Sequence, residues 1–133
     1  MTRSESREND ETAVTKGSEH TWQDLEQRTA RLGEAVIAFC KSVPASAVNT
    51  PLISQVVRSA TSVGANYCEA DDSESKKDFH HKIALCRKES RETKHWLRML
   101  VAANPGLKPT ARTLWQESKE LNLIFSAIFR KTG

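Results

Sequence analysis

Four stretches of this sequence place apolar residues alternately three and four positions apart, the spacing that gives an α-helix one apolar face. They cover residues 22–43, 53–67, 79–100 and 114–128, and small polar residues such as Thr29 fill some of the gaps. A helix with one apolar face must bury it against other elements. Four such helices joined by short loops predict an all-α fold, an antiparallel up-down-up-down four-helix bundle.

Capping residues mark the ends of the first two helices. Thr21 and Asp24 form a T-x-x-D pattern whose side chains can bind the free amide groups of a first helical turn, so the first helix is expected to begin at Thr21. Pro44 closes it, because proline cannot continue a helix. Thr50 followed by Pro51 fits an N-cap and the first position of the second helix.

Similar signals delimit the other two helices. The second helix is expected to run to about Ala70, and Ser75 with Asp78 predicts the start of the third. The Asn-Pro-Gly sequence at 104–106 ends the third helix near Ala103. The fourth helix follows Pro109.

Length and composition fit a single bundle. The chain has 133 residues, 38% of them hydrophobic and 28% charged, which suits one domain of amphipathic helices. Residues 1–20 have few large apolar side chains and are predicted to form a flexible N-terminal tail, which leaves residues 21–133 for the bundle. No run approaches the roughly 18 apolar residues that a membrane helix needs, and no signal peptide is recognisable, so we expect a cytoplasmic protein without a membrane segment.

The sequence offers no convincing metal or redox site. Cys40, Cys68 and Cys86 are widely spaced and are interpreted as buried free thiols. His81 and His95 lie about 21 Å apart on one helix, too far to share an ion, and adjacent His80 and His81 point in different directions. We expect neither a metal nor another cofactor.

Catalytic motifs are also missing. No G-x-S-x-G, H-E-x-x-H or Walker pattern occurs. Asn66, Glu69 and Glu92 could form an acid site if the fold brings them together, although hydrogen bonds between helices explain them more simply. We therefore predict a protein that is not an enzyme.

The third helix carries an unusual row of basic residues. Residues 76–98 have a net charge of +5, whereas residues 1–20 have −2. The row is two residues out of phase with the apolar face, a rotation of about 200°, so it should point away from the core. Its members are Lys77, His81, Lys88, Arg91, His95 and Arg98. Such a row can bind phosphates, with Trp96 or the histidines stacking on unpaired bases, or it can be an ordinary solvated face.

The second helix carries a polar stripe at spacings of three and four. Its members are Gln55, Ser59, Ser62, Asn66 and Glu69. A stripe of this kind is either exposed to solvent or packed as a polar seam against a neighbouring helix or subunit. Periodicity alone leaves both interpretations open.

Several motifs between residues 53 and 100 resemble a known family. They are R-x-A-x-S-x-x-x-N-x-x-E, S-K-K-x-F and S-x-E-T, represented here by Arg58, Ala60, Ser62, Asn66, Glu69, Ser75, Phe79, Ser90, Glu92 and Thr93. This pattern is similar to the small four-helix-bundle proteins encoded in intervening sequences of bacterial 23S rRNA genes. The family's usual N-I-A-E-G departs here to N-Y-C-E-A, residues 66–70, so alanine replaces the glycine that commonly ends the helix.

The resemblance implies a ring-like homopentamer. Relatives include accessory proteins of diversity-generating retroelements, which bind a reverse transcriptase and nucleic acid. A pentamer would repeat the basic row five times and strengthen a weak attraction to phosphate through avidity. The family motif residues, including Ser62, Asn66 and Glu69, are then expected to be structural and to form a seam between helices or subunits.

Two functional hypotheses follow. The first is a non-enzymatic oligomeric accessory protein that binds RNA, DNA or a ribonucleoprotein through the basic row, with a reverse transcriptase or another nucleic-acid enzyme as a possible partner. The alternative is an oligomeric protein-protein interaction scaffold with no nucleic-acid role, whose acidic turn or tail makes the contact.

Overall fold

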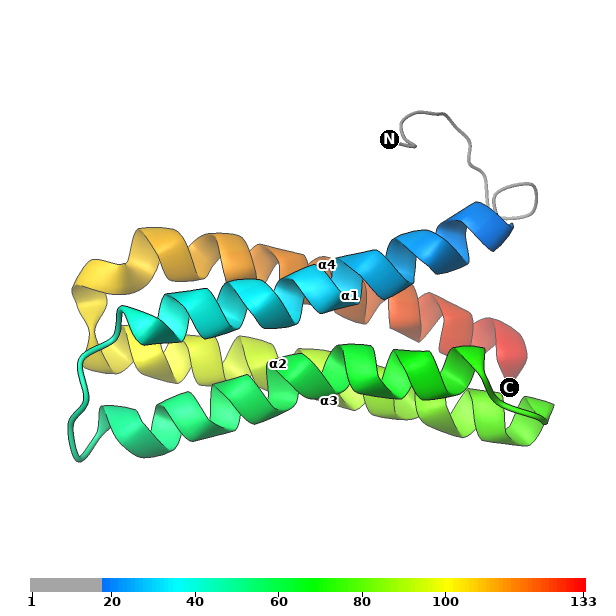
Figure 1. Cartoon of the computed structure of the whole chain (residues 1–133), viewed down its shortest axis with the longest axis horizontal. Coiled ribbons are helices and arrows are strands. Elements are labelled where there is room, and N and C mark those ends of the chain that lie inside the picture. Colours follow the sequence, from blue (N-terminus) through cyan, green and yellow to red (C-terminus); the bar gives the residue numbers. More distant parts are fainter. Residues whose placement is uncertain (1–17) are drawn as a thin grey trace.

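A computed structural model describes the backbone of residues 18–133 and the side chains from residue 24 onward. The helices are α1 (Ser18–Lys41), α2 (Asn49–Asp71), α3 (Lys76–Ala103) and α4 (Lys108–Thr132), and a short 3-10 helix, η1 (Pro105–Leu107), joins the last two. They run alternately up and down the bundle, and no strand occurs in the part of the chain described (Figure 1). The predicted all-α four-helix bundle is confirmed.

The core lies along the centre of the bundle and receives side chains from every helix. Val36, Val63, Leu97 and Phe125 are among its fully buried members. The helices neighbour one another in chain order, α1 beside α2, α2 beside α3 and α3 beside α4, while α1 touches α4 more sparsely. The outer side of the α3–α4 pair therefore faces away from the outer side of the α1–α2 pair.

Several helix ends agree with the sequence. The Ser75 hydroxyl accepts a hydrogen bond from the Asp78 backbone N–H at 3.0 Å, so Ser75 caps α3 as predicted. Asn104 ends α3, also as predicted. Its side chain exchanges hydrogen bonds with Asn49 at 2.9 and 3.1 Å, which ties the end of α3 to the start of α2.

Two predicted helix starts are wrong. Helix α1 begins at Ser18, so Thr21 lies inside it, and residues 1–17 of the predicted tail lie outside the described residues. Thr50 lies inside α2 and does not cap it. The Ser46 hydroxyl accepts a hydrogen bond from the Asn49 backbone N–H at 2.9 Å, so an earlier serine performs this role.

The thiols differ in their surroundings. Cys40 and Cys86 are buried as predicted, and burial raises their pKa to about 11 and about 12. Cys68 is exposed, so the prediction of a buried thiol is wrong there. It lies beside the apolar face of α2, at the edge of a groove between α1 and α2.

Neither a metal site nor a membrane helix is found in the described residues. Their His, Cys, Asp and Glu side chains form no group of three that could hold a metal ion. No described helix is both long and apolar enough to cross a bilayer.

Candidate nucleic-acid interface

The basic row lies on the outer surface of α3. All six of its members are exposed to solvent, namely Lys77, His81, Lys88, Arg91, His95 and Arg98. None of them forms an ion pair with another residue of the described chain. The core-facing side of the same helix carries Ile83, Cys86, Leu97 and Leu100, so the row points away from the core, as its periodicity predicts.

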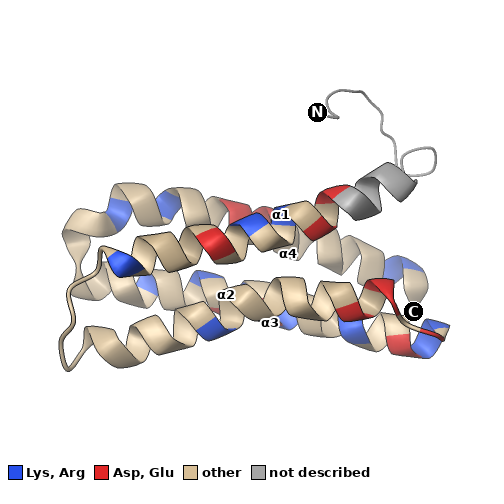
Figure 2. Ribbon diagram, viewed as in Figure 1, with Lys and Arg blue, Asp and Glu red and all other residues tan. Residues whose placement is uncertain are grey.

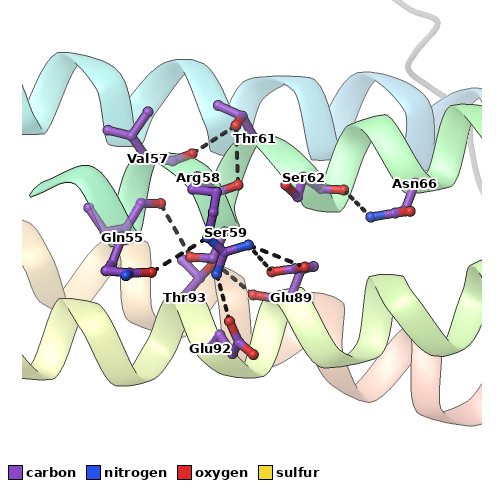
Figure 3. A network of polar contacts seen from close by, with 11 residues as sticks. Gln55, Val57, Arg58, Ser59, Thr61, Ser62, Asn66, Glu89, Glu92 and Thr93 are labelled. Atoms are coloured by element: carbon purple, nitrogen blue, oxygen red, sulfur yellow. Dashed lines mark hydrogen bonds and ion pairs between the residues drawn. The ribbon is translucent and has the colours of Figure 1, made fainter. Parts of the chain in front are cut away.

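On the flank of α3 that faces α2, opposite charges pair across the two helices. Arg58 of α2 binds two carboxylates of α3, with Nη1 3.3 Å from Glu89 Oε1 and Nη2 2.8 Å from Glu92 Oε1 (Figure 3). The hydrogen bond that Arg58 donates to Glu92 is the largest effect raising the pKa of Arg58. Nearer the α2–α3 loop, Lys82 Nζ lies 2.6 Å from Glu69 Oε1.

The polar stripe of α2 divides into two kinds of residue. Ser59 is fully buried, and its hydroxyl is hydrogen bonded to that of Thr93 on α3 at 3.0 Å. Ser62 and Asn66 interact within α2 instead, because the Asn66 side-chain amide donates to the Ser62 carbonyl at 2.9 Å (Figure 3). The stripe is therefore a seam between two helices of one chain at Ser59 and Glu69.

The possible acid site is not assembled. Glu69 pairs with Lys82, Glu92 pairs with Arg58, and Asn66 bonds to its own helix. The structure gives each of these residues a structural partner and does not bring the three together.

The family motif residues of α3 make internal contacts as well. Ser90 is buried and accepts a hydrogen bond from the Asn122 side chain of α4 at 3.2 Å. The same Asn122 amide donates to the Arg87 carbonyl at 2.8 Å. Phe79 packs against the core from a partly buried position. Ser90 and Thr93 thus join α3 to both of its neighbours.

A second cluster of cations lies between α3 and α4, around Trp115. Lys94 Nζ and Lys119 Nζ lie over the indole ring, 5.4 and 5.6 Å from its centroid. Beside the ring is a groove of about 330 Å³, the Trp115 groove. It is lined by Leu97, Arg98, Val101, Lys108, Ala111, Arg112, Trp115 and Gln116. Arg98 belongs to both the groove and the basic row, so the two surfaces are continuous.

Sequence reasoning missed this groove. It named Trp96 or the histidines for stacking, but Trp96 packs against the core and its Nε1 is buried without a hydrogen-bond partner among the described residues. A signal was present on α4, because Arg112 and Lys119 stand three residues before and four after Trp115 and so share its face.

The carboxylates of α3 and α4 are directed away from these cations. Glu89 and Glu92 bind Arg58, while Glu117 and Glu120 of α4 bind Arg28 of α1, each at 2.7 Å. The hydrogen bonding that Arg28 donates to the Glu117 carboxylate is the largest effect raising the pKa of Arg28. Asp78, in the first turn of α3, is the only other acidic residue of these two helices. In Figure 2, the blue bands that mark Lys and Arg recur on α3 and α4 toward the end of the bundle where η1 joins these helices.

Fold and surface together define a small antiparallel four-helix bundle with an outer basic face on its third and fourth helices. Residues 23–127 match the family described as 23S rRNA-intervening sequence proteins, so the chain belongs to that family. It is similar to a crystal structure of a protein of unknown function from the S23 ribosomal protein family of Bacteroides thetaiotaomicron. The two share 26% identity with a TM-score of 0.69, covering 79% of this chain and 97% of the other. No curated protein matches the chain.

Proposed function

We propose that this protein is a non-enzymatic, oligomeric accessory protein that binds nucleic acid or a ribonucleoprotein through the basic row of α3. One observation carries the proposal: the glutamates of α3 and α4 pair with arginines of α1 and α2, whereas the outward cations have no carboxylate partner in the described chain. Phosphate groups complement such a surface, and release of their condensed counterions drives binding.

The row has the dimensions of a phosphate-binding surface. From Lys77 to Arg98 it follows the helix for roughly 30 Å, and duplex DNA carries one charge per roughly 1.7 Å of axis. Lys77, Lys88, Arg91 and Arg98 are assigned the phosphate contacts, and His81 and His95 extend the row between them. Contacts to phosphates alone give little sequence preference.

The proposed assembly is a homopentamer in the cytoplasm. An apolar groove of about 340 Å³ between α1 and α2, with the exposed Ile37 on its wall, supports association on the side of the bundle opposite α3–α4. Subunits that meet through α1 and α2 leave the basic row free and repeat it, so weak phosphate contacts are multiplied by avidity. A reverse transcriptase or another nucleic-acid enzyme is the kind of protein such a particle would serve.

The test compares two charge reversals of equal size. Lys88→Glu with Arg91→Glu removes two members of the row, and Arg31→Glu with Lys41→Glu makes the same change at exposed positions of α1. Binding to labelled single-stranded RNA and duplex DNA is measured by fluorescence anisotropy over a salt series. We expect the row variant to bind at least about tenfold more weakly and its salt dependence to fall by about two units of slope.

The control variant should bind as the unmodified protein does, with circular dichroism verifying that both variants are folded. Light scattering should give a mass near five chains. Binding that ignores salt, or an equal loss in the α1 variant, would contradict the proposal.

A scaffold that binds another protein is the second candidate. The apolar α1–α2 groove favours it, as does the acidic end of the bundle, where Asp71, Asp72 and Glu74 are exposed. Capture of one defined protein partner by a pentamer that binds neither nucleic acid would support this candidate over the first.

A further inference from the structure

We infer that the Trp115 groove holds an unpaired base of single-stranded nucleic acid, with the indole of Trp115 as its stacking platform. This inference rests on the proposed function and names the form of nucleic acid that the protein selects. It concerns a site on α4 and the C-terminal part of α3, which shares only Arg98 with the basic row.

The composition of the groove supports the binding of a base. Its floor is apolar, formed by Leu97, Val101 and Ala111, and its rim carries Arg98, Lys108 and Arg112. All three rim cations are exposed and have no ion-pair partner in the described chain. A flat apolar surface surrounded by cations complements one base with its flanking phosphates, and single-strand-binding proteins combine these two features.

The position of Trp115 also supports its role as the stacking surface. The ring is partly buried against the core, so one side is held by packing. Trp115 itself lines the groove, whereas Lys94 and Lys119, which lie over its ring, are not among the lining residues. A base in the groove therefore meets the indole without displacing these two cations, and they add positive charge beside its flanking phosphates.

Size and chemistry define the occupant. A groove of about 330 Å³ is at the lower end of small-molecule sites, which range upward from roughly 300 Å³, and suits one nucleotide. The bases of a duplex have their faces covered by neighbouring pairs and cannot stack on an indole. The groove is therefore specific for unpaired nucleotides, while the continuous row on α3 accepts phosphates of either form.

The experiment measures binding of a labelled 12-nucleotide oligouridylate and of a duplex of the same length to Trp115→Leu, Trp115→Phe and the unmodified protein. Leucine preserves apolar packing but removes the stacking face, so affinity for the single strand should fall by about 5- to 100-fold while duplex affinity changes by less than about twofold. Phenylalanine restores an aromatic face and should recover most of the loss. Trp96→Phe is the matched control and should leave both affinities unchanged.

A second measurement does not depend on the leucine variant folding. In a protein with Trp22→Phe and Trp96→Phe, Trp115 is the single indole, and oligouridylate should quench its fluorescence whereas the duplex should not. Equal weakening of both nucleic acids by Trp115→Leu, no weakening of either, or unquenched fluorescence on single-strand binding would overturn the inference and leave the proposed function standing. Unmodified protein that binds neither nucleic acid would overturn the proposed function itself.

Discussion

The two flanks of α3 use charge in opposite ways. Toward α2, the carboxylates of Glu89 and Glu92 share Arg58, and Glu69 binds Lys82, so charge holds the helices together. Toward α4, cations gather on aromatic rings, as Arg87 does at 4.6 Å from the centroid of Phe129, and no carboxylate of the described residues pairs with them. Charges that are satisfied inside a fold have a structural role. Charges left unpaired beside an aromatic groove remain available to a ligand.

Reversing one arginine that is paired on the α2 flank and one arginine of the outward-facing basic row should give the largest difference. Arg58→Glu leaves three carboxylates together, and the Glu89 side chain is only 11% exposed, so water cannot replace the lost cation well. Because Arg58 itself is half exposed, we expect a loss of about 2 to 3 kcal/mol in the free energy of unfolding, less than for a fully buried pair. Urea denaturation followed by circular dichroism measures it.

The matched variant is Arg91→Glu, in the basic row. An exposed arginine without a partner should change stability by no more than about 0.5 kcal/mol, while nucleic-acid binding weakens. Similar losses of stability in both variants would show that the row also holds the fold together, and the contrast between the two flanks would fail.

A smaller effect is expected from the buried hydroxyl pair on the α2 side. Thr93→Val preserves shape but leaves the fully buried Ser59 hydroxyl without its partner on α3, at a cost of about 1 kcal/mol. The double variant Ser59→Ala with Thr93→Val should cost less than the sum of the two single changes, since both ends of the hydrogen bond between α2 and α3 are then removed together. Exposed Thr113→Val on α4 is the control. Strict additivity in the same denaturation assay would mean that the two hydroxyls do not interact.

The sequence predicted the bundle because the relevant signals are local. Apolar spacing and the Ser75 cap depend on residues a few positions apart, and both were correct. The prediction that Thr50 caps α2 was wrong because another residue close in the sequence competes for this role. The Ser46 hydroxyl accepts the hydrogen bond from the Asn49 backbone N–H. The prediction that Cys68 is buried was wrong because a position beside an apolar stripe is buried only if a neighbouring helix covers it.

The candidate site was only partly predictable. Periodicity placed the basic row on the outside of α3 but could not show which flank faces α4. The pairing of Arg58 with Glu89 and Glu92 spans 31 and 34 residues, and no periodicity within one helix encodes it. The Trp115 groove is built from Leu97, Arg98 and Val101 of α3 together with residues of α4, so it emerges only when the two helices pack.

The smallest effect should come from the lysines over Trp115. Lys94→Gln and Lys119→Gln each remove one exposed cation–π contact, and each should change the free energy of unfolding by less than about 0.5 kcal/mol. Both substitutions also relieve repulsion among unpaired cations. Salt screens this repulsion, so its relief matters most at low ionic strength, where any loss in the free energy of unfolding should shrink or become a gain. Denaturation at two salt concentrations measures this. A loss above about 1 kcal/mol from either substitution would make these lysines structural, like Arg58, and would remove the reason to regard their side of α3 as reserved for a ligand.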